Sequence, residues 1–119
     1  MIPETEIQKS ITAHNARNIE LLKLIREKGV AIDEPHSVDH HFYASGQKDA
    51  ALLAKELYKR GYLVLVLSPP STEDGQGHWN IGVGIQRAPA EAASHRITEE
   101  LVRLAAKFDA DYDGWGTLI

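Results

Sequence analysis

FDADYDGWGTLI, residues 108–119, can be read as a calcium loop, a strand or a recognition surface. Its D-A-D-Y-D-G segment, residues 109–114, matches the first half of the calcium-loop pattern D-x-[DN]-x-[DN]-G-x5-E. That pattern needs a bidentate Glu at its twelfth position, which would fall after Ile119, and a second helix to close the site. We therefore expect a polar turn after a helix, followed by an extended segment over Asp111–Leu118 rather than a calcium site.

The residues before this segment predict alternating helices and strands. Apolar residues recur at helical spacing in three places, and residues 37–43 alternate as a half-buried strand does. The expected elements are a helix at 4–28 that Gly29 ends, a strand at 37–43, a helix from Ser45 to Gly61, strands at 62–68 and 79–86, a helix from Pro89 to Phe108, and the extended segment at 111–118.

This order predicts an α+β fold with a ferredoxin-like β-α-β-β-α-β antiparallel sheet, preceded by an extra N-terminal helix. We expect a single domain over residues 1–119, in which residues 1–34 form the helix and a connector and residues 35–119 form the core. Both core helices should cover one face of the sheet. In the first strand, Val38, His40 and Phe42 then alternate with Asp39, His41 and Tyr43 on the opposite, open face.

Composition narrows the classes of function. The net charge of −4 has the wrong sign for general affinity to phosphate backbones, so we expect no direct nucleic-acid binding. The longest strongly apolar run, residues 62–67, is too short to cross a bilayer, and the first ten residues lack a signal-peptide design. The chain contains no cysteine, which agrees with a reducing compartment. These features predict a cytoplasmic protein without membrane contact.

Candidate catalytic and metal-binding residues do not form a convincing site. His40 and His41 are adjacent in a strand and should point to opposite faces, so they are not expected to chelate one ion. Ser94, His95 and Asp109 could be imagined as a triad, but we expect Ser94 to lie within a helix, where no sharp turn presents its hydroxyl. We predict no catalytic residue, no metal and no cofactor, and therefore no enzyme.

The strand at 62–68 carries aliphatic side chains on both faces. Tyr62, Val64 and Val66 alternate with Leu63, Leu65 and Leu67, so one of the two sets must face away from the helices. Such an apolar surface is either covered by the following loop or the N-terminal helix, or it is a contact site. A contact site here could bind a protein partner, or form a homodimer through the sheet face or the edge strand.

DADYDGWGT (109–117), together with HSVDHHF (36–42), resembles the regulator of ribonuclease E activity B family, the ribonuclease E inhibitor proteins. The resemblance covers most of the chain from about residue 21, and residues 112–117 are its most specific block. It implies a small cytosolic ferredoxin-like protein, without catalysis or cofactor, that binds a ribonuclease E-type endonuclease and restrains RNA decay. This chain is less acidic than that type, which makes the fold easier to transfer than the partner.

We predict that a partner binds the open face and edge of the sheet. Trp115 has two interpretations, as a core ring between Gly114 and Gly116 or as a contact residue, and the core is favoured. An alternative function is a small-molecule-binding or minor enzymatic domain that uses Asp39, His41 and Asp113. The predicted partner-binding residues are Asp39, His41, Tyr43, Leu63, Leu65, Asp113 and Trp115.

Overall fold

The computed structural model describes residues 2–70 and 77–118. The centre of the connection between the second and third strands, which we expected to be a long hairpin loop, lies outside the described residues. The elements are α1 (Glu4–Glu27), β1 (His36–Ala44), α2 (Gln47–Lys59), β2 (Leu63–Ser68), β3 (Trp79–Arg87), α3 (Pro89–Ala92), α4 (His95–Lys107) and β4 (Ala110–Thr117).

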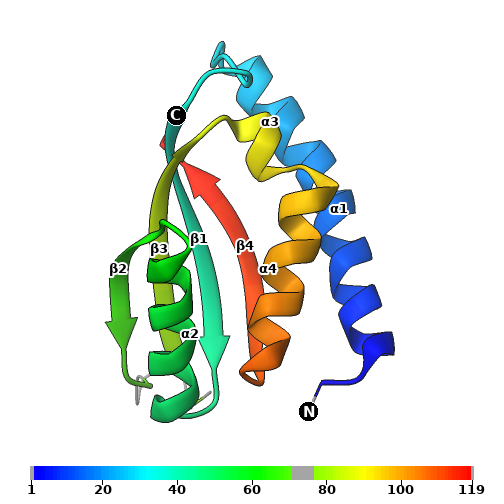
Figure 1. Ribbon diagram of the computed structural model, residues 1–119. Coiled ribbons are helices and arrows are strands. Elements are labelled where there is room, and N and C mark those ends of the chain that lie inside the picture. Colours follow the sequence, from blue (N-terminus) through cyan, green and yellow to red (C-terminus); the bar gives the residue numbers. More distant parts are fainter. Residues whose placement is uncertain (1, 71–76, 119) are drawn as a thin grey trace.

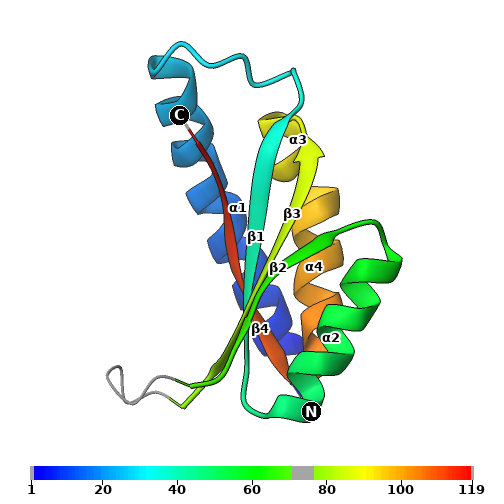
Figure 2. The same cartoon turned by 90° about the vertical axis from the view of Figure 1, so that its left-hand side faces the viewer.

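The four strands form one sheet in the order β2-β3-β1-β4, with antiparallel pairing throughout. Helices α2 and α4 lie together on one side of the strands (Figures 1 and 2). The predicted α+β arrangement, an N-terminal helix followed by β-α-β-β-α-β, is therefore confirmed. The last twelve residues contain the fourth strand, as expected, and Asp111 and Asp113 belong to that strand.

Helix α1 runs beside α4 (Figure 1). It ends where Gly29 adopts a φ of 77°, a conformation that glycine tolerates and that is common one residue after a helix. Ile11 and Ile25 on α1 are buried, and His14 Nε2 donates to the Tyr112 carbonyl on β4 at 2.9 Å. The helix is thus attached to the sheet at several points along its length.

A β-bulge in β4 decides which of its side chains face the helices. Phe42 of β1 stands opposite Tyr112, but the next residue, His41, stands opposite Gly114, so Asp113 is an extra residue on β4. Gly114 accommodates the bend with a φ of 108°. Because of this extra residue both Tyr112 and Trp115 face the helices; regular alternation would have placed Trp115 opposite Asp39 on the other face.

Residues 12–18 form a polar segment in the middle of α1, where they interrupt its apolar stripe. One of them holds Trp115 in the core. Asn18 is buried; its Oδ1 accepts from Trp115 Nε1 at 3.0 Å, and its Nδ2 donates to Thr98 Oγ1 at 3.2 Å. These bonds link α1, α4 and β4. Buried polar groups that are fully paired in this way fix the relative position of the elements that carry them.

Three sequence predictions need correction. The helix expected from Pro89 to Phe108 breaks in two, because Ser94 is the N-cap of α4, where its Oγ accepts from the Ile97 N–H at 3.3 Å. Ser94 is therefore not inside a helix, although its hydroxyl is engaged in the cap. Helical spacing in the sequence places Tyr58 in the apolar stripe of α2, but Tyr58 is exposed. The N-cap of α2 is Gly46, not Ser45.

We predict that Asn18→Leu destabilises the protein by about 1–3 kcal/mol, because the buried Trp115 N–H and Thr98 hydroxyl lose their partner. Urea unfolding followed by tryptophan fluorescence measures this change. Thr12→Leu, an exposed position on the same helix, is the control and should change the free energy of unfolding by less than about 0.5 kcal/mol. Equal effects of the two substitutions would contradict the role given to Asn18.

Candidate partner-binding face

The side of the sheet away from α2 and α4 exposes a continuous group of side chains, which we call the open face. Pairing register places outward residues of β1 beside outward residues of β3 and β4. The β2 side chains Leu63, Leu65 and Val66 are 62%, 52% and 46% exposed. The open face comprises Asp39, His41 and Tyr43 on β1, Asn80, Gly82 and Gly84 on β3, Leu63, Leu65 and Val66 on β2, and Asp111 and Asp113 on β4.

A second bulge, in β2, concentrates the aliphatic side chains on this face. Val64 pairs with Val83, but Val66 pairs with Gly82, so Leu65 is an extra residue. The expected alternation of two sets of three therefore does not hold. Val66 joins Leu63 and Leu65 on the open face, whereas Leu67 pairs with Ile81 on the helix side. Sequence reasoning missed Val66, because a bulge leaves no mark in the alternation of a strand that is apolar throughout.

Glycines on β3 let the β2 side chains lie flat across the sheet. A Cβ at Gly84 would be only 3.0 Å from Leu65 Cδ1, and a Cβ at Gly82 would be 3.3 Å from Val66 Cβ. The same two positions lie 3.5 Å from Asp39 Oδ1 and 3.6 Å from His41 Nδ1. The apolar side chains of β2 and the polar side chains of β1 therefore meet above β3, where no side chain separates them.

Two shallow hollows lie on this face. The first, of about 360 Å³, includes Asp39, Leu63, Leu65 and Gly84 in its lining, and we call it the Asp39 hollow. The second, of about 330 Å³, includes His41, Tyr43, Val66, Gly82 and Asp113, and we call it the Asp113 hollow. In each hollow an aliphatic wall from β2 is present together with a carboxylate from β1 or β4.

The charge of the open face is negative. Among the described residues of the four strands, Arg87 is the one Lys or Arg. Its guanidinium lies on the helix side, where Nη1 donates to Tyr62 Oη at 3.0 Å and to His40 Nε2 at 3.2 Å. Arg17 of α1 approaches the rim, with its Nη1 3.5 Å from the Asp113 carbonyl oxygen that accepts from it. Strand side chains thus give this face carboxylates at positions 39, 111 and 113 without a strand cation to neutralise them.

The structure places the predicted contact residues in two environments. Asp39, His41, Tyr43, Leu63, Leu65 and Asp113 all lie on the open face. Trp115 is 7% exposed and belongs to the core that includes Ile25 and Val38. Trp115 is therefore a core ring, which is the interpretation that the sequence favoured, and it is not part of the candidate interface.

The three residues of the alternative small-molecule site are divided between the two hollows. Asp39 lines one hollow, whereas His41 and Asp113 line the other. No group of three or more His, Cys, Asp or Glu side chains within residues 2–70 and 77–118 could hold a metal ion. In the same part of the chain, no helix has the length and apolar character needed to cross a membrane.

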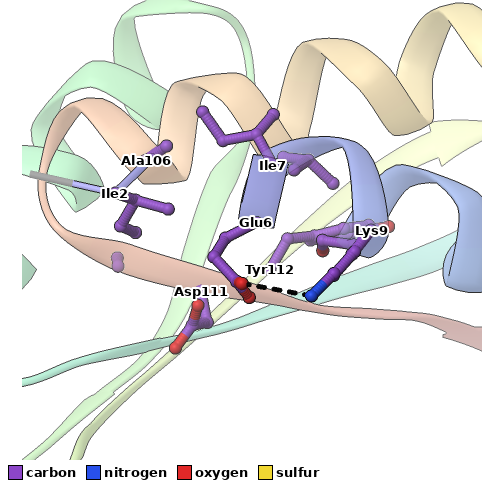
Figure 3. A pocket seen from close by; sticks show the side chains of 10 residues that line it. Ile2, Glu6, Ile7, Lys9, Ala106, Asp111 and Tyr112 are labelled. Atoms are coloured by element: carbon purple, nitrogen blue, oxygen red, sulfur yellow. Dashed lines mark hydrogen bonds and ion pairs between the residues drawn. The ribbon is translucent and has the colours of Figure 1, made fainter. Parts of the chain in front are cut away.

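A third pocket, of about 280 Å³, lies between α1, α4 and β4 and includes Ile2, Ile7 and Tyr112 (Figure 3). Its polar side is occupied by an ion pair between Lys9 Nζ and Glu6 Oε1 at 3.5 Å, and both side chains are exposed. Lys9 and Glu6 are three residues apart on one helix, so their pairing is an ordinary surface contact. The pocket offers no convergent set of groups that would select a ligand.

A polar cluster surrounds His40 on the helix side of the sheet. The ring is completely buried, and its Nδ1 lies 2.8 Å from Tyr112 Oη. Arg87 can only donate, so His40 Nε2 must accept from it and Nδ1 must carry the proton that is donated to Tyr112. Burial, with a smaller contribution from the Arg87 charge, lowers the pKa of His40 to about 3, and burial raises the pKa of Tyr112 well above its usual range. This cluster is a satisfied core element rather than an acid–base site.

We predict that the free energy of unfolding falls in mild acid because of His40. Its pKa is about 3 in the folded protein and near 6.5 in the unfolded chain, so only the unfolded chain gains a proton as the pH falls below 6.5. Between pH 7 and pH 5 this difference should remove about 2 kcal/mol of unfolding free energy. His40→Leu should lose that part of the pH dependence in urea titrations at the two pH values, whereas exposed His41→Gln should keep it. Parallel pH dependence in wild type and His40→Leu would contradict the assignment.

Comparison with known proteins connects this architecture to a family. The family described as "Regulator of ribonuclease activity B" matches residues 15–117. A protein of that name from Psychromonas ingrahamii is 28% identical over 111 residues, which cover 93% of this chain and 92% of the relative. The relative from Photobacterium profundum is 32% identical and that from Escherichia coli 30%, with 82% of this chain covered in both and 75% and 70% of the relatives. The chain belongs to the regulator of ribonuclease activity B family.

Proposed function

We propose that this chain is a non-catalytic cytoplasmic protein that regulates a ribonuclease of the ribonuclease E type by binding it through the open face, and thereby modulates RNA decay. The observation that carries the proposal is the strip formed by Leu63, Leu65 and Val66 beside the carboxylates of β1 and β4. Exposed aliphatic side chains that adjoin uncompensated charge are typical of a surface that binds another protein.

The chemistry of the face favours a protein over RNA as the direct partner. RNA-binding sheets of related topology present aromatic rings for base stacking and cations for phosphates. Here β3 has Gly82 and Gly84 at its outward positions, and the strand carboxylates at 39, 111 and 113 would repel phosphates. Regulation would then act on the ribonuclease itself, by occupying a segment that the enzyme needs for activity or assembly.

We predict that Leu65→Asp weakens binding to a purified ribonuclease E-type endonuclease at least about tenfold, equivalent to roughly 1.4 kcal/mol. The substitution adds a charge to an apolar contact. It should leave the melting temperature within about 2 °C of wild type, because Leu65 is half exposed. Biolayer interferometry and calorimetry measure the two effects.

Leu104→Asp is the matched control for stability. Leu104 is 3% exposed in α4, so the same change buries an unpaired charge and should unfold the protein. Leu52→Asp, on the exposed side of α2, is the matched control for binding and should bind as wild type does. Wild-type affinity of a folded Leu65→Asp variant would refute the open face as the binding surface.

We further predict that binding weakens with salt but persists. Salt screens the electrostatic attraction between the partner and the carboxylates at the two hollows. It does not screen the apolar contacts that the aliphatic strip makes. The dissociation constant should therefore rise between about 50 and 300 mM NaCl and then level off.

Sedimentation velocity over the same series tests whether β2, at the edge of the sheet, pairs with a second copy instead. A dimer lost in Leu65→Asp, without any ribonuclease binding, would assign the strip to self-association.

A further inference from the structure

The two hollows share a construction that selects one kind of side chain. In the Asp39 hollow, Leu65 and Asp39 approach the same point above Gly84, at 3.0 Å and 3.5 Å. In the Asp113 hollow, Val66 provides the aliphatic wall, and Asp113, Tyr43 and His41 line it together with Asn80 and Gly82. A ligand that satisfies both walls needs a long apolar stem and a cationic head. Arginine and lysine are the side chains with that form.

We propose that the two hollows receive two basic side chains from one segment of the protein partner, with arginine preferred over lysine. The methylene stems would lie along the β2 side chains, and the cationic heads would reach Asp39 in one hollow and Asp113 in the other. This inference rests on the proposed function and deepens it, because it names the chemistry of the bound segment. Charge complementarity carries it, since the strands give the open face three carboxylates and no Lys or Arg, and Arg17 of α1 reaches only the rim beside the Asp113 carbonyl.

The preference for arginine follows from the Asp113 hollow. A planar guanidinium can stack on an aromatic ring while its edge donates to a carboxylate, and the exposed Tyr43 and Asp113 are residues of the same hollow. An ammonium group gains less from the ring and is held by water more strongly. Tyr43 is accompanied by the His78 ring, with centroids 6.0 Å apart, so the aromatic surface at this end is broader than one ring.

The register of β3 sets the spacing of the two basic residues. Gly84 and Gly82, which form the floors of the two hollows, are two residues apart on one strand, or roughly 7 Å. Alternate residues of an extended chain, and residues i and i+4 of a helix, have about this separation. Both forms bring two basic side chains to one surface, so the bound segment should carry its basic residues at one of these two spacings.

The test uses three fluorescein-labelled peptides: GSRARAGS, its lysine counterpart GSKAKAGS, and its citrulline counterpart, which keeps the stem and removes the charge. Fluorescence anisotropy should show saturable binding of the arginine peptide, weaker binding of the lysine peptide and none of the citrulline peptide. Asp39→Asn, Asp113→Asn and Leu65→Ser should each weaken the arginine peptide about threefold to tenfold. Glu20→Gln on α1 removes the same charge elsewhere, and Leu52→Ser removes an exposed leucine elsewhere; both should bind as wild type does.

The same Asn variants are then measured against the ribonuclease. Ribonuclease binding that depends on Leu65 but is unchanged in Asp39→Asn and Asp113→Asn would overturn the dibasic assignment and leave the proposed function standing. Equal loss in Glu20→Gln would also overturn it, because net charge rather than the two hollows would then explain the effect. Loss of ribonuclease binding in both Asn variants, with circular dichroism and melting temperature unchanged, is the result that we expect.

Discussion

Asp113, the extra residue in β4, determines which side chains of that strand face the core. Asp113 and Gly114 together oppose one residue of β1, and the positive φ of Gly114 makes that bend accessible at little conformational cost. As a result Trp115 lies opposite His40 and faces the helices, where its indole N–H donates to the side-chain Oδ1 of Asn18. One local irregularity therefore closes the core, attaches α1 and keeps a large aromatic ring off the open face.

The second irregularity, in β2, has the opposite consequence for function. The extra Leu65 places an additional aliphatic side chain on the open face, beside glycines that leave room for it. Aliphatic side chains that remain half in water stabilise the fold less than buried ones do, because the gain is proportional to the apolar area removed from water. Their position beside Asp39 and Asp113 is instead well suited to association, which agrees with a family named for regulating another protein's activity. The two bulges of one sheet thus separate the core from the candidate interface.

The sequence predicts the order of elements well because that order depends on local periodicity and on helix-ending glycines such as Gly29 and Gly61. It also predicts the inward His40 and the outward His41, since adjacent strand residues point to opposite faces. It does not predict Val66 on the open face, because a bulge shifts register without a distinct residue pattern in an apolar strand. The role of Asn18 is equally hidden, since its partner Trp115 lies 97 residues away.

A ribonuclease that binds the open face of the sheet, as we propose, leaves the helix face free. Methyl NMR of leucine and valine side chains tests this proposal directly, because these methyl groups occur on the open face, in the core and on the outer surface of α2. On titration with the ribonuclease E-type endonuclease, the methyl signals of Leu63, Leu65 and Val66 should shift or broaden first, and that of Leu52 should not. Perturbation centred on Leu52 or on Leu24 of α1, with the β2 signals unchanged, would contradict the account.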